Sequence, residues 1–207
     1  LVACKELEIT LTGKSCGLEE RAPMCGIPYH AVEGYLSKLV SRGYKVAICE
    51  QVEDPKLAKG LVKREVIRVV TPGTNLNVQS LEAGKNNYLL SIAYTPDGIG
   101  ISAADVTTGD YYVTEVEDLK KLNDELMKYE PSEIICNEAF LVSGFDVNDL
   151  KSRLHISVNA LESHMFDDDG CRRILMKHFK VNTLIGLGVE EFPTGLLAAG
   201  ALLQYQY

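Results

Sequence analysis

Residues 23–55 constrain the fold more tightly than any other stretch, because turn, helix and stop signals follow one another there without a gap. Two prolines and a glycine between 23 and 28 predict a tight turn, since proline fixes the backbone and glycine frees it. Apolar residues then recur at helical spacing over 32–40. Gly43 follows at the position where a helix end takes up the left-handed conformation. The stretch therefore predicts a turn and then an amphipathic helix with a defined end.

Strand signals surround this helix. Residues 44–52 are β-branched and mostly apolar, which predicts a buried strand. Residues 61–70 predict a second strand, with basic residues interspersed. Near the start of the chain, residues 1–7 predict the tail of a helix and residues 8–13 a short strand that a glycine ends.

A change in composition predicts two domains. Residues 75–86 are polar and show no hydrophobic periodicity, so we expect a linker there. The first domain is then 1–74 and the second 87–192. Residues 193–207 begin a last helix, with proline at its first position.

The second half has a regular alternation of elements that predicts three hairpin-linked strands, a helix, another strand and further helices. This order resembles a ribonuclease H-like sheet. The predicted strands are 87–94, 99–106, 111–116 and 132–137, and the predicted helices are 117–130, 146–154 and 171–179.

Composition excludes several classes of protein. No run approaches the roughly 18 apolar residues of a membrane helix. The six cysteines show no paired Cys/His spacing, so we expect buried, reduced thiols in a cytoplasmic protein and neither zinc nor disulfides. The net charge is −8, which by itself argues against nucleic acid. Residues 1–70 nevertheless carry 11 Lys and Arg against 9 Asp and Glu, so the first part is mildly basic.

Two stretches resemble the mismatch-recognition domain of the MutS family of DNA mismatch repair proteins. They are PMCGIPYHAVEGYLSKLVSRGYKVAICEQVEDP and, after it, KREVIRVVTPGT. The resemblance runs nearly unbroken from Leu7 to Thr74, and residues 87–192 resemble the ribonuclease H-like connector domain of that family. It implies a mixed α/β fold: a truncated mixed sheet with helices, then the connector domain. The helix of 193–207 would lead toward the family's lever region.

The resemblance also implies what reads the DNA. In the family, a Phe-X-Glu motif ahead of this stretch stacks on the mispaired base and hydrogen-bonds to it. No Phe-X-Glu precedes the match here. We therefore expect these residues to lack the group that recognises the mispaired base and to keep only weak contacts with the DNA backbone. The residues that the resemblance places beside the DNA are Met24, Gly26, Tyr29, His30, Lys38 and Arg68. Taken alone, these residues would be a helix entrance and a solvated face.

Two other functions stay open on the residues. Asp105 and Asp110, with Glu133 as a third acid, could serve a metal-dependent ribonuclease H-like nuclease, although the turn already explains Asp110. Alternatively, the acidic second half could be a docking module for repair partners. A phosphate-binding P-loop is excluded, because Glu8 stands where the motif ending at Gly13-Lys14-Ser15 needs its first glycine.

We therefore expect a non-catalytic part of a mismatch-repair protein. Its expected partner is mismatched double-stranded DNA, with the connector domain relaying between the DNA-binding and ATPase regions of the intact protein. ATP, Mg²⁺, a MutS homodimer partner and a MutL-type repair protein are implied for the intact protein only. No cofactor, metal or membrane is expected for these residues, and the expected location is the bacterial cytoplasm, at the nucleoid when DNA is bound.

Overall fold

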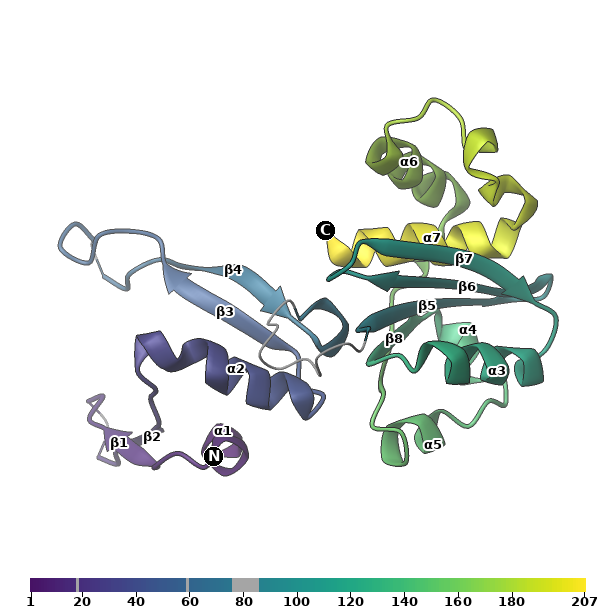
Figure 1. Cartoon of the computed structure of the whole chain (residues 1–207). Coiled ribbons are helices and arrows are strands. Elements are labelled where there is room, and N and C mark those ends of the chain that lie inside the picture. The colour runs from purple at the N-terminus through teal and green to yellow at the C-terminus, as the bar shows by residue number, and fades with distance from the viewer. Residues whose placement is uncertain (18, 59, 76–85) are drawn as a thin grey trace. The chain divides into compact units, whose positions relative to one another are not determined.

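The computed structural model describes residues 1–17, 19–58, 60–75 and 86–207, which fall into two units (Figure 1). The chain passes from the first unit to the second after Thr71. The short 3₁₀ helix η2 (Pro72–Thr74) thus belongs with the second unit, whereas the sequence placed it in the first domain. Most of the predicted linker, 76–85, lies outside the described residues.

The first unit begins with helix α1 (Val2–Leu7), as expected. Glu8 ends this helix in the left-handed conformation, with φ of 56°. The strand predicted for 8–13 is therefore shifted: β1 (Thr12–Lys14) starts later and pairs antiparallel with β2 (Ala22–Met24). The turn predicted from residue 23 is shifted too, because β2 includes a proline, which an edge strand tolerates.

The central helix is confirmed. The 3₁₀ helix η1 (Tyr29–Ala31) leads into α2 (Val32–Ser41). At its end, Gly43 adopts φ of 83° and donates to the carbonyl of Val40 at 2.9 Å. The next amide, Tyr44, donates to the carbonyl of Leu39 at 3.1 Å, which completes a Schellman motif.

Strands β3 (Val46–Gln51) and β4 (Arg64–Val70) form an antiparallel pair. The prediction that 44–52 is buried was wrong. Only the face toward α2 is covered, where Val46, Ile48 and Val70 pack against two buried residues of the helix. The opposite face leaves Val66 58% and Val69 56% exposed. Among the described residues, the first unit thus has two antiparallel strand pairs rather than one mixed sheet.

The second unit is built on a five-stranded sheet in the order β7-β6-β5-β8-β9 (Figure 1). The three hairpin-linked strands run antiparallel, and β8 and β9 run parallel to β5. The predicted order is confirmed, but the sequence missed β9, a four-residue strand in which Val158 alone is buried and which therefore lacks the apolar run that marks β8. The strands are β5 (Tyr88–Thr95), β6 (Gly98–Asp105), β7 (Asp110–Val116), β8 (Glu133–Cys136) and β9 (Ser157–Ala160).

Helices cover both faces of this sheet. On one face, Leu122 and Leu126 of α3 pack with Leu90 and Ile92 of β5. On the other face lies α7, whose Leu202 packs on the sheet. The helices of this unit are α3 (Leu119–Tyr129), α4 (Glu138–Leu141), α5 (Val147–Ser152), α6 (Asp168–Phe179) and α7 (Pro193–Gln206), with 3₁₀ turns η4 (Ser163–Phe166), η5 (Ile185–Leu187) and η6 (Val189–Glu191). No helix among the described residues is long and apolar enough to cross a bilayer.

Candidate nucleic-acid interface

Four of the six predicted DNA-contacting residues lie in one short exposed segment that joins β2 to α2. Met24 is the last residue of β2 and is 43% exposed. Gly26 is exposed, and Tyr29 and His30 open η1. The side chain of Tyr29 is 84% exposed, so it contributes nothing to a core and is available to a ligand.

Local hydrogen bonds hold this segment in place. Thr12 Oγ1 donates to the carbonyl of Met24 at 2.8 Å, which anchors the end of β2. Pro28 is extended, with φ −62° and ψ 139°, and its carbonyl accepts from the amide of Ala31 at 3.0 Å. Tyr29 and His30 are thereby set at the entrance of α2, ahead of its buried face.

Lys38 lies on the solvent face of α2. Leu36 and Val40, two residues to either side, are the buried residues of the helix. Two residues rotate a helix by about 200°, so Lys38 points away from the core. It lies roughly 12 Å along the axis from His30 at 1.5 Å per residue. Its ammonium group can therefore contact a phosphate some distance from the Met24–His30 segment, but it does not form one pocket with that segment.

Arg68 lies on the face of β4 that looks toward α2. Its Nη2 is 3.1 Å from Oε1 of Glu33, in the first turn of the helix. Both side chains are about half exposed, so solvent screens the pair and a phosphate can compete for the guanidinium group. Arg68 is therefore near the helix entrance, but Glu33 neutralises much of its charge.

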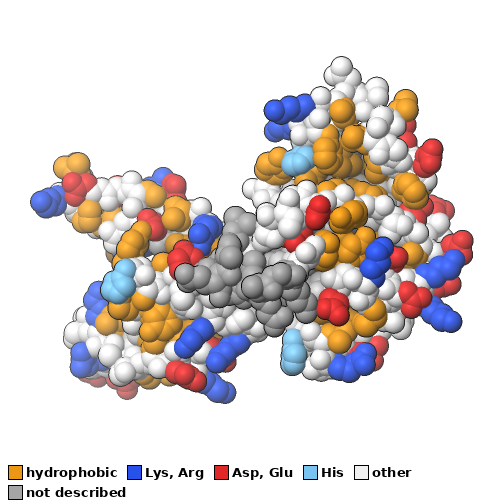
Figure 2. Space-filling model, viewed as in Figure 1, with side chains coloured by type: hydrophobic (Ala, Val, Ile, Leu, Met, Phe, Trp, Pro, Cys, Tyr) orange, Lys and Arg blue, Asp and Glu red, His pale blue; other side chains and the backbone are white. Residues whose placement is uncertain are grey.

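Two exposed cations of the β1–β2 hairpin were not predicted: Arg21, which donates to the carbonyl of Gly13, and Lys14. Lys14 is the last residue of β1 and pairs with Ala22, two residues from the pair of Thr12 and Met24. No sequence signal singled out Lys14, because the predicted strand ended at Gly13 and placed Lys14 in the loop that follows. On the face drawn in Figure 2, the basic side chains of the first unit are scattered among other residues and form no single patch.

The three acids of the nuclease hypothesis do not converge: Asp105 and Asp110 pair directly across β6 and β7, but Glu133 lies on the other face of the sheet. Asp105 pairs with Tyr88 and Glu133 pairs with Leu89. Tyr88 and Leu89 are neighbours on one strand, so their side chains and those of their partners point to opposite faces of the sheet. The described residues contain no group of three His, Cys, Asp or Glu that could hold a metal ion. The nuclease interpretation is thus not favoured.

Each buried acid has a structural role instead. Asp105 accepts hydrogen bonds from the hydroxyl of Thr107 at 2.6 Å and from the amide of Asn87 at 3.0 Å. Burial by itself raises the pKa of Asp105, but these hydrogen bonds outweigh it and lower the pKa below its usual value. Glu133 accepts from the amide of Gly73 at 3.0 Å and from the hydroxyl of Tyr205 at 2.6 Å.

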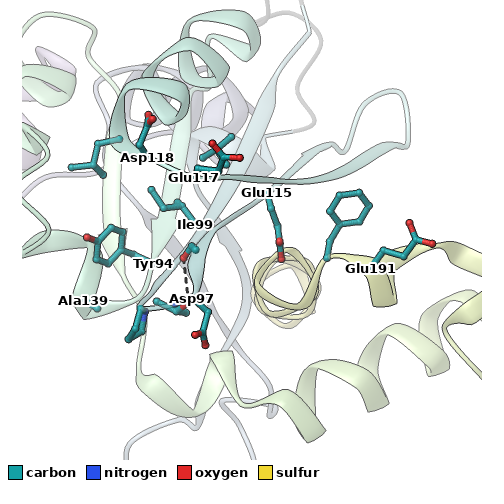
Figure 3. A pocket seen from close by; sticks show the side chains of 14 residues that line it. Tyr94, Asp97, Ile99, Glu115, Glu117, Asp118, Ala139 and Glu191 are labelled. Atoms are coloured by element: carbon teal, nitrogen blue, oxygen red, sulfur yellow. Dashed lines mark hydrogen bonds between the residues drawn. The ribbon is translucent and has the colours of Figure 1, made fainter.

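An open cavity of about 830 Å³ lies in the second unit, between the β5–β6 turn and the ends of β7 and α7 (Figure 3). Its lining is acidic, so it repels nucleic-acid phosphate. Glu115 points toward α7, where its Oε1 accepts from the hydroxyl of Thr194 at 2.7 Å and the amide of Gly195 at 3.0 Å. The acidic residues of the lining are Asp97, Glu115, Glu117, Asp118 and Glu191.

Comparison with known families gives two matches that together cover nearly all of the chain. Residues 1–79 match the family model of MutS domain I. Residues 87–206 match the family model of MutS domain II. The boundary between the two matches falls close to the boundary between the two units.

Proteins named DNA mismatch repair protein MutS are similar over the whole chain. The identity is 63% with the protein of Lachnoclostridium phytofermentans over 100% of this chain and 22% of the relative. It is 48% with that of Ruminiclostridium cellulolyticum over 99% of this chain and 23% of the relative. The identity is 42% with the protein of Methanococcoides burtonii, over 99% of this chain and 23% of the relative. The chain thus spans less than a quarter of the length of these relatives.

Proposed function

Because the chain belongs to the MutS family of DNA mismatch repair proteins, we propose that its first unit binds the sugar-phosphate backbone of duplex DNA. The observation that carries this proposal is the exposed segment from Met24 to His30, with Tyr29 84% exposed at the entrance of α2. Lys38 on the solvent face of the helix, and Arg68 once it leaves Glu33, would add phosphate contacts. Such contacts position a protein on DNA without reading its sequence.

The proposed binding is weak and indifferent to mismatches. The 207 residues contain no Phe-X-Glu, the motif that resemblance to the family assigns to the mispaired base. A wedge inserted at a base step is what distinguishes a deformable mismatch from a paired duplex. Without that wedge, the remaining contacts meet matched and mismatched duplexes alike.

We propose that the second unit does no chemistry and relays between the DNA-contacting and ATPase regions of the intact protein. The described residues contain no group of three acids, cysteines or histidines that could hold a metal ion, and the open cavity beside Glu115 has an acidic lining. ATP and Mg²⁺, a second MutS subunit and a MutL-type repair protein are proposed as ligands of the intact protein, in the bacterial cytoplasm. Docking of repair partners on the acidic surface of this unit is compatible with the same role.

Fluorescence anisotropy tests the DNA proposal. A labelled duplex with one G·T mismatch and its matched twin are titrated with the chain across a salt series. We expect equal, weak affinities that fall steeply with salt, because each neutralised phosphate releases a counterion. A clear preference for the mismatch would contradict the proposal, since the segment from Met24 to His30 would then read DNA shape by itself.

Lys38→Gln gives the residue-level prediction. It should weaken binding to both duplexes by the same factor and reduce the slope of log affinity against log salt by about 1, because one phosphate contact is lost. Lys121→Gln is the matched control, because Lys121 is an exposed helix lysine of the second unit that pairs with Glu117 at 2.6 Å. An unchanged salt slope for Lys38→Gln would remove Lys38 from the interface.

A further inference from the structure

Strand β7 is an edge of the five-stranded sheet, and no strand among the described residues pairs with its outer side (Figure 1). Edge strands usually carry a lysine, a proline or a bulge, which prevents another chain from pairing with them. Residues 110–116 contain neither lysine nor proline, and their pairing with β6 is regular throughout. The edge at β7 therefore lacks the usual protection.

The register of the sheet shows which main-chain groups face this open side. A two-residue turn joins β5 to β6, so Thr95 and Gly98 exchange hydrogen bonds across it. Along β6, Gly98 and every second residue after it then face β5, and the others face β7. On β7, the main-chain groups of Tyr111, Val113 and Glu115 therefore point outward. All three residues are partly exposed, and within the described part of the chain no segment outside the sheet hydrogen-bonds to their main chain.

The side chains of the same three residues lie on the face that α7 covers, beside two cavities. Tyr111 and Glu115 hydrogen-bond to α7, and Val113 packs with it. Tyr111 and Val113 line a cavity of about 300 Å³ together with apolar residues of α6 and of the turns η5 and η6. Glu115 lines the acidic cavity of about 830 Å³ in Figure 3. Phe192 lines both, so an apolar cavity and an acidic one follow each other along β7.

Charge distinguishes between the possible partners of this edge. Residues 110–118 carry four acids and no base. Pairing with a second copy of β7 would bring four acids from each strand together, and like charges across a strand pair are destabilising. A strand that carries lysine or arginine would instead be attracted.

We propose that the β7 edge binds an extended, basic peptide segment of a partner protein, which adds a strand to the sheet. Its main chain pairs with Tyr111, Val113 and Glu115, an apolar side chain enters the cavity of about 300 Å³, and a basic side chain on the same face lies toward the acidic cavity. This site rests on the docking role proposed for the second unit and gives it a partner chemistry. DNA binding is proposed for the first unit, so a peptide assay can fail without affecting that proposal.

Fluorescence anisotropy with a designed peptide tests the site. The probe is fluorescein-labelled Lys-Thr-Lys-Thr-Val-Thr-Leu, whose lysines, valine and leucine share one face of an extended strand. In antiparallel pairing, its valine lies opposite Val113 and its lysines lie opposite Glu115 and Glu117. We expect saturable binding that weakens with salt. The absence of binding at about 1 mM peptide would overturn the proposal.

Methylated peptides separate strand pairing from simple charge attraction. N-methylation of the valine removes the N–H that faces Val113, so affinity should fall at least about tenfold. N-methylation of the threonine after it changes an N–H that faces solvent, so affinity should stay within about twofold. A peptide with glutamate in place of both lysines should also bind at least about tenfold more weakly. Equal affinities for the two methylated peptides would overturn the pairing.

Leu187→Lys tests the apolar cavity. Leu187 lines this cavity and is 42% exposed, so the variant places a charge there at little cost to the core. Affinity for the probe should fall at least about fivefold, because the apolar side chain loses its site. Ile185→Lys is the matched control, since Ile185 lies in the same turn, is 71% exposed and does not line the cavity. Both variants add the same charge, so equal losses would overturn the role of the cavity.

Discussion

At Gly100 the backbone of α7 crosses β6 without room for a side chain. A Cβ added there would lie 2.0 Å from the carbonyl oxygen of Thr194, far inside van der Waals contact. Gly200 is similar, since its added Cβ would lie 2.2 Å from Cβ of Cys171 on α6. Single hydrogen atoms at these positions thus let one helix pack between the sheet and its neighbour.

Gly100→Ala should therefore destabilise the second unit by several kcal/mol, because overpacking against a backbone commonly costs about 1–3 kcal/mol and here a helix must shift. The measurement is the urea midpoint followed by circular dichroism. Gly186→Ala is the matched control, because nothing lies within 4 Å of its added Cβ and its φ is ordinary. Equal midpoints for the two variants would contradict the proposed close approach.

Asp105 makes a prediction about pH. Its pKa is lowered in the folded protein, so the carboxylate stabilises the fold above the unfolded pKa of about 3.9, and this contribution is lost as the pH falls through the lower, folded pKa. Asp105→Asn should lower stability at pH 7 by roughly 1–3 kcal/mol, since an amide cannot accept all of these hydrogen bonds. It should also flatten the fall in stability on acidification below about pH 5.

Urea midpoints at several pH values between 7 and 3 measure this effect. Asp97→Asn is the control, because Asp97 is exposed at the β5–β6 turn. The interpretation fails if Asp105→Asn keeps the pH dependence of the unmodified chain.

At the scale of elements, three helices of the second unit start in the same way. Asp118, Asp146 and Asp167 each accept a hydrogen bond from a backbone amide three residues on. The sequence predicts a helix that begins near Asp118. Such a start can be predicted from sequence because the capping hydrogen bond joins residues only three apart.

Asp118→Ala should cost about 1 kcal/mol, because the amide of Lys121 loses its partner at the start of α3. Asp124→Ala, on an exposed position within the same helix, should be neutral or slightly stabilising, because alanine favours helix. Denaturant titration of both variants measures the difference. If the two are equally stable, the cap does not matter to this helix.

At the scale of the whole molecule, the two units differ greatly in core size. Among the described residues of the first unit, the buried apolar side chains are Leu7, Leu36, Val40 and Val70. The second unit buries a continuous set on both faces of its sheet. Since burial of apolar surface is the main stabilising term, the first unit should be the less stable.

Hydrogen exchange followed by mass spectrometry tests this difference. Amides of β3 and β4 should exchange at least about tenfold faster than those of β5 and β6, which corresponds to roughly 1.4 kcal/mol in opening free energy. Equal protection in the two units would mean that they unfold together.

The sequence by itself determined the features that depend on neighbours a few residues apart. The helix Val32–Ser41 with its Gly43 stop, the hairpin strands of the second unit and the family resemblance all follow from local periodicity, turn chemistry and an unbroken motif. Four of the six candidate DNA-contacting residues were expected beside one another because they are close in the chain.

Only the tertiary structure decided the features that depend on distant partners. Residues 44–52 lie in an exposed pair because one helix covers only one face. The register of non-consecutive strands sends Asp105 and Glu133 to opposite faces of the sheet. Arg68 meets Glu33 across folded segments, from a strand and a helix 35 residues apart in the chain. The physical reason is that burial and charge pairing are set by neighbours in space, which long-range packing chooses and local sequence does not encode.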